Sequence, residues 1–399
     1  MTSISEDIMP QVSTERLITH IEGNNQGPIV VFLAGIHGNE PSGVFALERL
    51  SQKLVGNEKN ISGNIYALRG NINALEKGIR FEKEDLNRLW TKSRMQALNQ
   101  KHVFISNPDQ AEQQDLYENL MSIINRHEGP FYFMDLHTTS SHTIPFITLN
   151  DTILNRKFTR LFPMPIILGI EEYLKGPALS YINELGYVAF GFEAGQHDEK
   201  QSVDNHEAFA YVSLVLTGVL PETKLFHRYM QRLKKATRGI GGFYEIFYRH
   251  EIQQEEEFIM RPGFVNFQTV RKNAYLAESN NEGIYAPHES RVLMPLYQTQ
   301  GEDGFFLIRK IAPIYLHISA ILRKLRMDHL LTLLPGVSWQ TKAKEGLKIN
   351  LRIARFFAKP IFHLLGYRSV EIGDHYLFAN SREKASRDKE YKFAKWNYK

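Results

Sequence analysis

The sequence contains no cysteine among its 399 residues. This absence excludes disulfide bonds and thiolate metal sites, so any metal ion would be held by histidine, aspartate or glutamate. Long apolar runs are also missing: no segment approaches the ~18 apolar residues that span a membrane, so we expect no stable membrane insertion. The 48 basic and 44 acidic side chains leave a net charge of only +4. That balance gives no reason to expect nucleic acid as a partner.

The amino-terminal residues 1–7 are polar and acidic, and they lack the basic and apolar segments of a signal peptide. We therefore expect a cytoplasmic protein. The contents of 43% hydrophobic and 23% charged residues are ordinary for globular proteins, and the length is sufficient for two or three domains.

Short apolar runs alternate with amphipathic stretches over residues 1–222. The predicted strands are 29–34, 63–68, 131–136, 145–149, 165–168 and 187–192, and the predicted helices are 41–55, 111–127 and 205–219. This alternation predicts an α/β domain around a mostly parallel sheet. Such sheets place their functional sites at the carboxyl ends of the strands.

The pattern changes after residue 222. A basic, helical linker is predicted at 224–238, and residues 239–311 form short β-type runs separated by Gly, Pro and Asn, so we expect a small all-β domain at 223–311. Residues 312–399 are predicted to form a helical extension with helices at 314–334 and 350–366. From Ser381 the chain has seven Lys or Arg against three acids, which favours a solvated, partly disordered tail over one that contacts an anionic surface.

The segment Ile29 to Glu40 combines a buried strand with two metal-ligand side chains. Six consecutive apolar residues end at Ala34, and a glycine-rich turn then carries His37 and Glu40. An imidazole and a carboxylate three residues apart can bind one cation, and zinc would require a third protein ligand. Alternatively, the spacing arises by chance or Glu40 caps the helix that follows.

A third ligand is predicted at the end of another apolar strand, where Phe131 to Leu136 leads into His137. Asp135 on the same strand would hold the imidazole in the required orientation. A single histidine at a strand end is more often a core or capping residue. Two such histidines together with Glu40 favour a metal site.

The polar segment 80–88 is predicted to form a loop over the site. Asn87 and Arg88 would bind a carboxylate through several donors, and Arg80 would stabilise negative charge on a reacting carbonyl. Taken alone, this charged run would be interpreted as a solvated surface.

Glu193 ends the apolar strand that begins near Tyr187. Burial of a carboxylate is costly unless it is paired or used, and it raises the pKa towards that of a proton shuttle. We therefore predict that Glu193 takes a proton from the attacking water and delivers it to the leaving nitrogen. A fourth metal ligand or a structural ion pair is the alternative.

These motifs together resemble the succinylglutamate desuccinylase/aspartoacylase family, a branch of the zinc-carboxypeptidase fold. The resemblance is carried by His37-x-x-Glu40, Asp85-Leu-Asn87-Arg88, Asp135-Leu-His137 and Glu193-Ala-Gly, in that order along the chain. Segments such as 263–267 and 294–305 resemble its carboxyl-terminal β domain. Residues 334–336 and 362–367 resemble the extension of its longer members.

The resemblance implies an α/β/α catalytic domain with one Zn²⁺ per chain. The implied roles are zinc binding by His37, Glu40 and His137, general base and acid catalysis by Glu193, carbonyl polarisation by Arg80, carboxylate binding by Asn87 and Arg88, and a contribution from a β-domain tyrosine, Tyr297. One departure concerns the substrate. An arginine expected about ten residues before Glu193 is missing from 180–186, and Lys175 is in the wrong register, so N-acetylaspartate or succinylglutamate is not implied.

The sequence therefore predicts a zinc-dependent hydrolase that cleaves the amide, or an ester, bond of an N-acyl amino acid or a similar small substrate. A zinc carboxypeptidase acting on peptides is the first alternative. A non-catalytic metal-binding or membrane-surface adaptor is the second. Association into a homo-oligomer is compatible with the sequence, which does not specify it.

Overall fold

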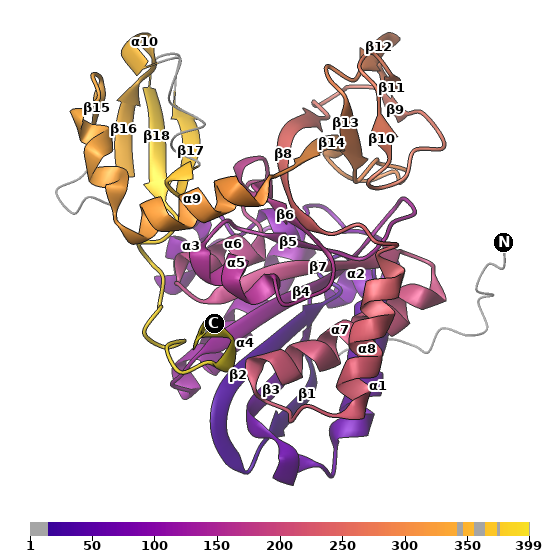
Figure 1. Cartoon of the computed structure of the whole chain (residues 1–399). Helices are drawn as coiled ribbons and strands as arrows, with labels where there is room; N and C mark the ends of the chain where they lie inside the picture. The colour runs from indigo at the N-terminus through magenta and orange to yellow at the C-terminus, as the bar shows by residue number, and fades with distance from the viewer. Residues whose placement is uncertain (1–14, 341–345, 355–363, 373–375, 399) are drawn as a thin grey trace.

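A computed structural model describes residues 15–340, 346–354, 364–372 and 376–398. Its largest element is an eleven-stranded sheet (Figure 1). In spatial order the strands are β1 (Leu17–Glu22), β3 (Ser62–Arg69), β2 (Asn25–Ala34), β4 (Phe131–Thr139), β7 (Val188–Gln196), β5 (Phe146–Leu149), β6 (Pro165–Leu168), β8 (Gly242–Glu251), β14 (Asp303–Lys310), β13 (Ser290–Leu293) and β10 (Thr269–Val270).

The centre of this sheet is mostly parallel, as predicted. Strands β3, β2, β4 and β7 run in one direction, and β5, β6 and β8 are parallel to one another. β1 is antiparallel to β3 and β5 is antiparallel to β7, so the sheet is mixed. Because β2, β4 and β7 are parallel neighbours, their carboxyl ends meet at one edge.

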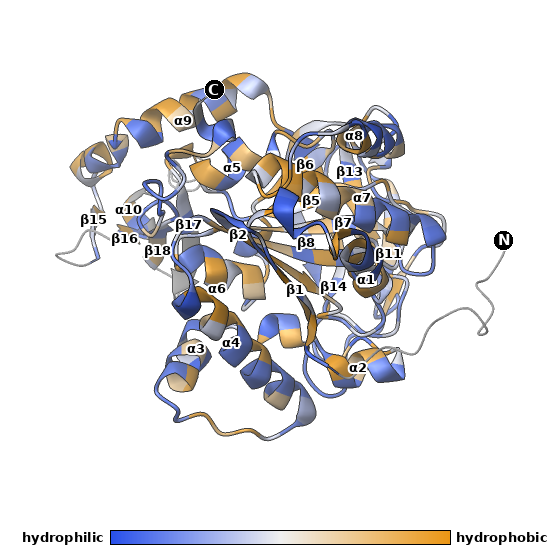
Figure 2. Ribbon diagram, turned by 90° about the horizontal axis from the view of Figure 1, so that it is seen from below, coloured by the Kyte–Doolittle hydropathy of each residue, from blue (hydrophilic) through white to orange (hydrophobic). Residues whose placement is uncertain are grey.

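Helices cover both faces of the parallel strands. The helices are α1 (Ser42–Leu54), α2 (Ile72–Lys77), α3 (Lys92–Asn99), α4 (Pro108–Arg126), α5 (Ile153–Thr159), α6 (Ala178–Glu184), α7 (Lys200–Thr217) and α8 (Lys224–Ala236). Short 3₁₀ turns lie at η2 (Glu58–Asn60), η3 (Leu86–Arg88) and η4 (Ile170–Glu172). Figure 2 shows hydrophobic and hydrophilic residues alternating along the helices around the sheet, as amphipathic helices require.

The side chains of β2 alternate between two hydrophobic cores. Val30 and Phe32 pack with α1, α5 and α7, whereas Val31 and Leu33 pack with α3, α4 and α6. Strands buried on both faces read as continuous apolar runs, which explains the segment that begins at Ile29. The arrangement is an α/β/α sandwich. The helix predicted at 224–238 is present as α8, and it packs against α7.

Four of the strands after residue 239, which are β8, β14, β13 and β10, extend this sheet. β8 pairs with β6 from Gly242 to Glu245 and with β14 from Tyr244 to Glu251, so one strand joins both regions. A second sheet contains β12 (Glu282–Tyr285), β11 (Tyr275–Ser279) and β9 (Phe258–Met260). The connection between β13 and β14 reaches the carboxyl edge of the parallel strands, because Gln298 in this connection accepts a hydrogen bond from Asn39 in the turn after β2.

The carboxyl-terminal extension contains both helices and a sheet. Its helices are α9 (Pro313–Lys324), η5 (Met327–Leu333) and α10 (Leu351–Ala354), and the order of its antiparallel strands is β15 (Val337–Trp339), β16 (Gly346–Asn350), β18 (Tyr376–Ser381) and β17 (Tyr367–Ile372). The predicted helix at 350–366 lies largely outside the described residues. The prediction missed the sheet because its strands are short and alternate polar with apolar residues over only five or six positions.

The tail after Ser381 is packed into the main core, which corrects the prediction of a solvated tail. The Tyr391 hydroxyl accepts the backbone N–H of Val188 at 2.9 Å, and the ring of Trp396, which belongs to η6 (Lys395–Tyr398), lies 5.3 Å from that of Phe158. Both aromatic side chains are buried. The number of basic residues in the tail does not predict that Tyr391 and Trp396 are buried.

Within the described part of the chain, no helix combines the length and the apolar character that crossing a membrane requires.

We expect Trp396→Ala to lower the free energy of unfolding by about 3–5 kcal/mol, because the substitution leaves a cavity where a buried ring packed. Urea unfolding followed by circular dichroism would measure this change. Phe393→Ala is the matched control, because Phe393 lies in the same tail with 76% of its surface exposed. Equal unfolding midpoints for the two variants would contradict a stabilising role for the buried tail.

Candidate metal centre and active site

The turn that follows β2 brings His37 and Glu40 to the edge of the sheet. Gly35 begins this turn with φ of 70°, in the left-handed region that favours glycine. A Cβ on Gly38 would lie 2.0 Å from the backbone carbon of Ala74, so only glycine allows this close approach. The two glycines therefore fix the direction in which the turn presents its histidine and glutamate.

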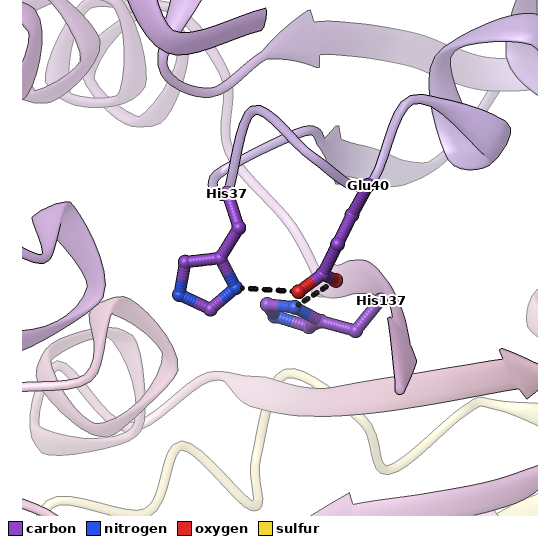
Figure 3. A group of neighbouring side chains, drawn as sticks. All are labelled: His37, Glu40 and His137. Atoms are coloured by element: carbon purple, nitrogen blue, oxygen red, sulfur yellow. Dashed lines mark hydrogen bonds and ion pairs between the residues drawn. The ribbon is translucent and has the colours of Figure 1, made fainter. Parts of the chain in front are cut away.

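Glu40 lies between two imidazoles (Figure 3). Its Oε1 is 2.9 Å from Nδ1 of His37, and its Oε2 is 3.2 Å from Nδ1 of His137, which comes from β4. One ligand atom from each of the three side chains lies within 4.8 Å of the others, and all three residues are buried. The structure thus brings together the three residues that the sequence predicted as metal ligands.

The remaining nitrogen of each imidazole faces a second carboxylate. Nε2 of His37 is 3.1 Å from Oδ1 of Asp85, and Nε2 of His137 is 2.8 Å from Oδ2 of Asp135. A carboxylate that accepts Nε2–H leaves Nδ1 as the electron-pair donor, which is the arrangement found around histidines that bind metals. This donor set of two nitrogens and one carboxylate fits a zinc ion with one open position.

Burial and the neighbouring charges shift the pKa values of Glu40 and His137 in opposite directions. Burial raises the pKa of Glu40, but its interactions with His37 and His137 outweigh burial and bring the pKa well below the usual value. Burial lowers the pKa of His137, but Asp135 and Glu40 outweigh it and raise the pKa well above the usual value. The site therefore stabilises positive charge between its carboxylates.

Glu193 lies directly across from His137, because β4 and β7 pair these two residues in register. Its side chain is buried, and its Oε2 has no hydrogen-bond partner among the described residues. Burial raises the pKa of Glu193 to about 8, and the negative charge of Glu40 adds to this shift while His137 opposes it. A carboxyl group with such a pKa can exchange a proton near neutral pH.

The loop 80–88 lies beside this cluster. Arg80 donates through Nε and Nη2 to Oδ2 of Asp85, at 3.2 and 2.9 Å, and its Nη1 is 3.7 Å from Oε1 of Glu40. Arg88 donates to Oδ2 of Asp303 at 2.8 Å. Asn87 accepts the backbone N–H of Ala178 through Oδ1, which leaves its amide N–H groups to donate.

These residues line one cavity of about 1040 Å³, including its mouth. Its walls carry His37, Glu40, Arg80, Asn87, Arg88, His137 and Glu193, together with residues from β5, β7, α6 and η4. Leu296, Gln298 and Asp303 close one side from the β-rich region. The cavity is thus built jointly by the α/β sandwich and the loops that follow it.

Tyr297 lies away from the reacting groups. Its hydroxyl donates to the carbonyl of Arg261 at 2.7 Å and accepts the N–H of Phe264 at 3.0 Å, and it is not among the described residues that line the cavity. Its neighbours Leu296 and Gln298 line the cavity instead. The difference arises because side chains of adjacent residues in an extended segment point to opposite sides.

Residues 26–215 match the model of the succinylglutamate desuccinylase/aspartoacylase catalytic domain. Residues 26–215, a little under half of the chain, therefore resemble the catalytic domain of this family. The succinylglutamate desuccinylase of Pseudomonas paraeruginosa is 31% identical over 121 residues, which are 30% of this chain and 34% of that relative. The curated relative is thus matched over only about a third of its length.

Two solved structures of desuccinylase/aspartoacylase proteins have a fold similar to that of this chain. The succinylglutamate desuccinylase/aspartoacylase from Rhodobacter sphaeroides has a TM-score of 0.54 and 16% identity, covering 73% of this chain and 88% of that chain. The succinylglutamate desuccinylase from Vibrio parahaemolyticus has a TM-score of 0.53 and 12% identity, and the similarity covers 72% of this chain and 82% of that chain. At these identities the similarity establishes the fold alone.

Four side chains near the site were not predicted to have a role, namely Asp85, Thr138, His197 and Gln298. Asp85 repeats for His37 the contact that Asp135 makes with His137, and its position two residues before Asn87 was the available signal. His197 connects Thr138, at 2.8 Å, with Gln298, at 3.0 Å. Nothing in the sequence signals this link, because Gln298 comes from a distant strand connection.

We expect His37→Ala to lose the bound zinc, because two protein ligands and a water do not hold the ion in competition with a chelator. Metal analysis after gel filtration in the presence of a weak chelator would measure the zinc per chain. The control is His227→Ala on α8, whose exposed imidazole pairs with Glu222 at 3.1 Å. A full zinc complement in His37→Ala would rule out the proposed ligand set.

Proposed function

We propose that this protein is a zinc-dependent hydrolase that cleaves the amide bond of a small N-acyl amino acid. The observation that carries the proposal is the paired arrangement of the two histidines. Each directs Nδ1 towards Glu40 and Nε2 towards its own aspartate, and a buried glutamate, Glu193, lies next to them. Metal ligands, oriented imidazoles and a proton carrier are the components of metal-assisted hydrolysis.

His37, Glu40 and His137 would hold the ion, with Asp85 and Asp135 as the partners that orient the imidazoles. Zinc bound there would act as a Lewis acid that lowers the pKa of a water molecule. Because the three ligands are buried and already in contact, little rearrangement would be needed before binding. This preorganisation supports the assignment.

Glu193 would act as the general base and then as the general acid. Its buried carboxyl group accepts a proton from the attacking water and delivers it to the nitrogen of the breaking amide bond. The pKa of about 8 suits this exchange, since the group then passes between its two forms near neutral pH. The free Oε2 supplies the atom that carries the proton.

Arg80 would stabilise the negative charge that develops on the substrate carbonyl oxygen. Its guanidinium is held by Asp85, and its Nη1 lies nearest the metal ligands, so the cation is fixed before reaction begins. Asn87 and Arg88 line the same cavity and would bind the substrate carboxylate through amide and guanidinium donors. Together these groups would fix the orientation of the scissile bond.

The closed side of the cavity favours a small substrate over a peptide. Leu296 and Gln298 lie over the site, and Gln298 accepts a hydrogen bond from Asn39 at 3.0 Å, which ties the covering loop to the turn that carries His37. Assaying zinc-loaded protein against N-acyl amino acids and dipeptides would test the choice. Faster cleavage of peptides would favour a carboxypeptidase, and cleavage of neither class would favour a metal-binding adaptor.

Glu193→Gln should retain zinc while kcat falls about 10²–10⁴-fold, because the amide keeps the shape of the side chain but cannot carry the proton. Steady-state kinetics and metal analysis on the same preparation would separate the two effects. Glu118→Gln makes the same chemical change on the exposed face of α4 and should leave both unchanged. Undiminished turnover in Glu193→Gln would remove the role assigned to this glutamate.

A further inference from the structure

The cavity continues from the metal ligands along the face of β7. Glu193, Gly191 and Ala189 line it at every second position, so they lie on one face of the strand. The five residues from Ala189 to Glu193 span about 13 Å at the rise of an extended strand. Thr148 lies beside this face, because β5 pairs it with Gly191. The cavity therefore has room for a substrate group well beyond the scissile bond.

This inner part has its own set of side chains, which we term the distal subsite. It consists of Thr148, Leu149, Asn150, Glu171, Leu179 and Ser180, all of which line the cavity. The set contains no lysine, arginine or histidine. The two arginines that line the cavity are Arg80 and Arg88 in the loop 80–88. The cavity thus offers cations near loop 80–88 and none among the residues of the distal subsite.

Glu171 gives the distal subsite a negative charge. The side chain is 1% exposed, and its Oε1 lies 2.9 Å from Nε of Arg382. Its Oε2 has no hydrogen-bond partner among the described residues. A buried carboxylate oxygen without a donor repels a second carboxylate and accepts a hydrogen bond from a neutral or cationic group.

The arginines behind this wall are neutralised by carboxylates. Arg382 pairs with Glu171 and also with Glu172, and Arg323 donates to Oδ2 of Asp151 at 2.8 Å. Both arginines belong to the carboxyl-terminal extension and are buried against the loops that follow β5 and β6. The extension thus supplies the cations that hold Glu171 and Asp151 in place.

We propose that the distal subsite binds a group of the substrate that carries no negative charge and excludes a carboxylate. On the proposed function, the substrate is an N-acyl amino acid with a single carboxylate, held by Arg88 and Asn87. The group that enters the distal subsite is apolar or carries an amide or hydroxyl, which Thr148, Asn150 and Ser180 can bind. The inference rests on the proposed function for the position of the scissile bond.

Substrate pairs of matched shape test this inference on the zinc-loaded, full-length protein. For the amino-acid side the pairs are N-acetylasparagine with N-acetylaspartate and N-acetylglutamine with N-acetylglutamate. For the acyl side the pair is N-succinamoylglycine with N-succinylglycine. We expect kcat/KM to be at least about tenfold higher for the uncharged member on the side of the substrate that enters the distal subsite, because an unpaired buried carboxylate is strongly disfavoured.

Equal or higher kcat/KM for the charged members on both sides would overturn the inference and leave the proposed hydrolase intact. Hydrolysis of none of these compounds would instead overturn the proposed function itself. The two failures are therefore distinguishable in one set of assays.

Glu171→Gln tests the residue that we hold responsible. The amide removes the negative charge and leaves Arg382 with one carboxylate fewer, so we expect the preference for uncharged substrates to fall about tenfold. Glu172→Gln is the matched control, since Glu172 pairs with the same arginine but is not among the described residues that line the cavity. It should keep the wild-type preference.

An unchanged preference in Glu171→Gln, or an equal loss in both variants, would overturn the role of Glu171. Circular dichroism would establish that each variant is folded. If Glu171→Gln does not fold, the substrate pairs measured on the wild-type protein decide the inference by themselves.

Discussion

The site depends on the concentration of buried negative charge at the carboxyl edge of the sheet. Glu40, Asp85, Asp135 and Glu193 lie around two imidazoles and the guanidinium of Arg80. Buried carboxylates are costly unless a cation accompanies them, so such a cluster attracts a positive ion and resists the ionisation of one of its members. Against the effect of burial, the two histidines lower the pKa of Glu40, whereas burial, together with the negative charge of Glu40, raises the pKa of Glu193.

The parallel sheet makes this crowding possible. Strands β2, β4 and β7 are neighbours with one direction, so residues far apart in the chain reach the same edge. Gly38 allows the turn after β2 to pass against Ala74, and the register of β4 with β7 places His137 opposite Glu193. The hydrophobic cores on both faces hold these strands in place, and the strands in turn position the charged groups at their carboxyl ends.

The regions after residue 222 shape the cavity rather than the metal centre. Gln298 and Asp303 from the β-rich region contact the turn of His37 and the loop of Arg88. Arg323 and Arg382 from the extension form a second buried network of charges with Asp151 and Glu171, behind the distal wall. The first cluster of charges lies at the carboxyl edge of the sheet, whereas this second network holds one wall of the cavity in place.

The sequence by itself determined the α/β class, the mostly parallel sheet and the residues His37, Glu40, His137 and Glu193 that meet at its edge, because apolar runs ending in polar side chains are local patterns. It did not reveal the sheet in the extension, the burial of Trp396 or the position of Tyr297. Contacts such as Arg382 with Glu171 join segments with no periodic relation to each other, and no local pattern encodes which wall an arginine will meet. Only the tertiary structure decided these pairings, and with them the charge of the distal subsite.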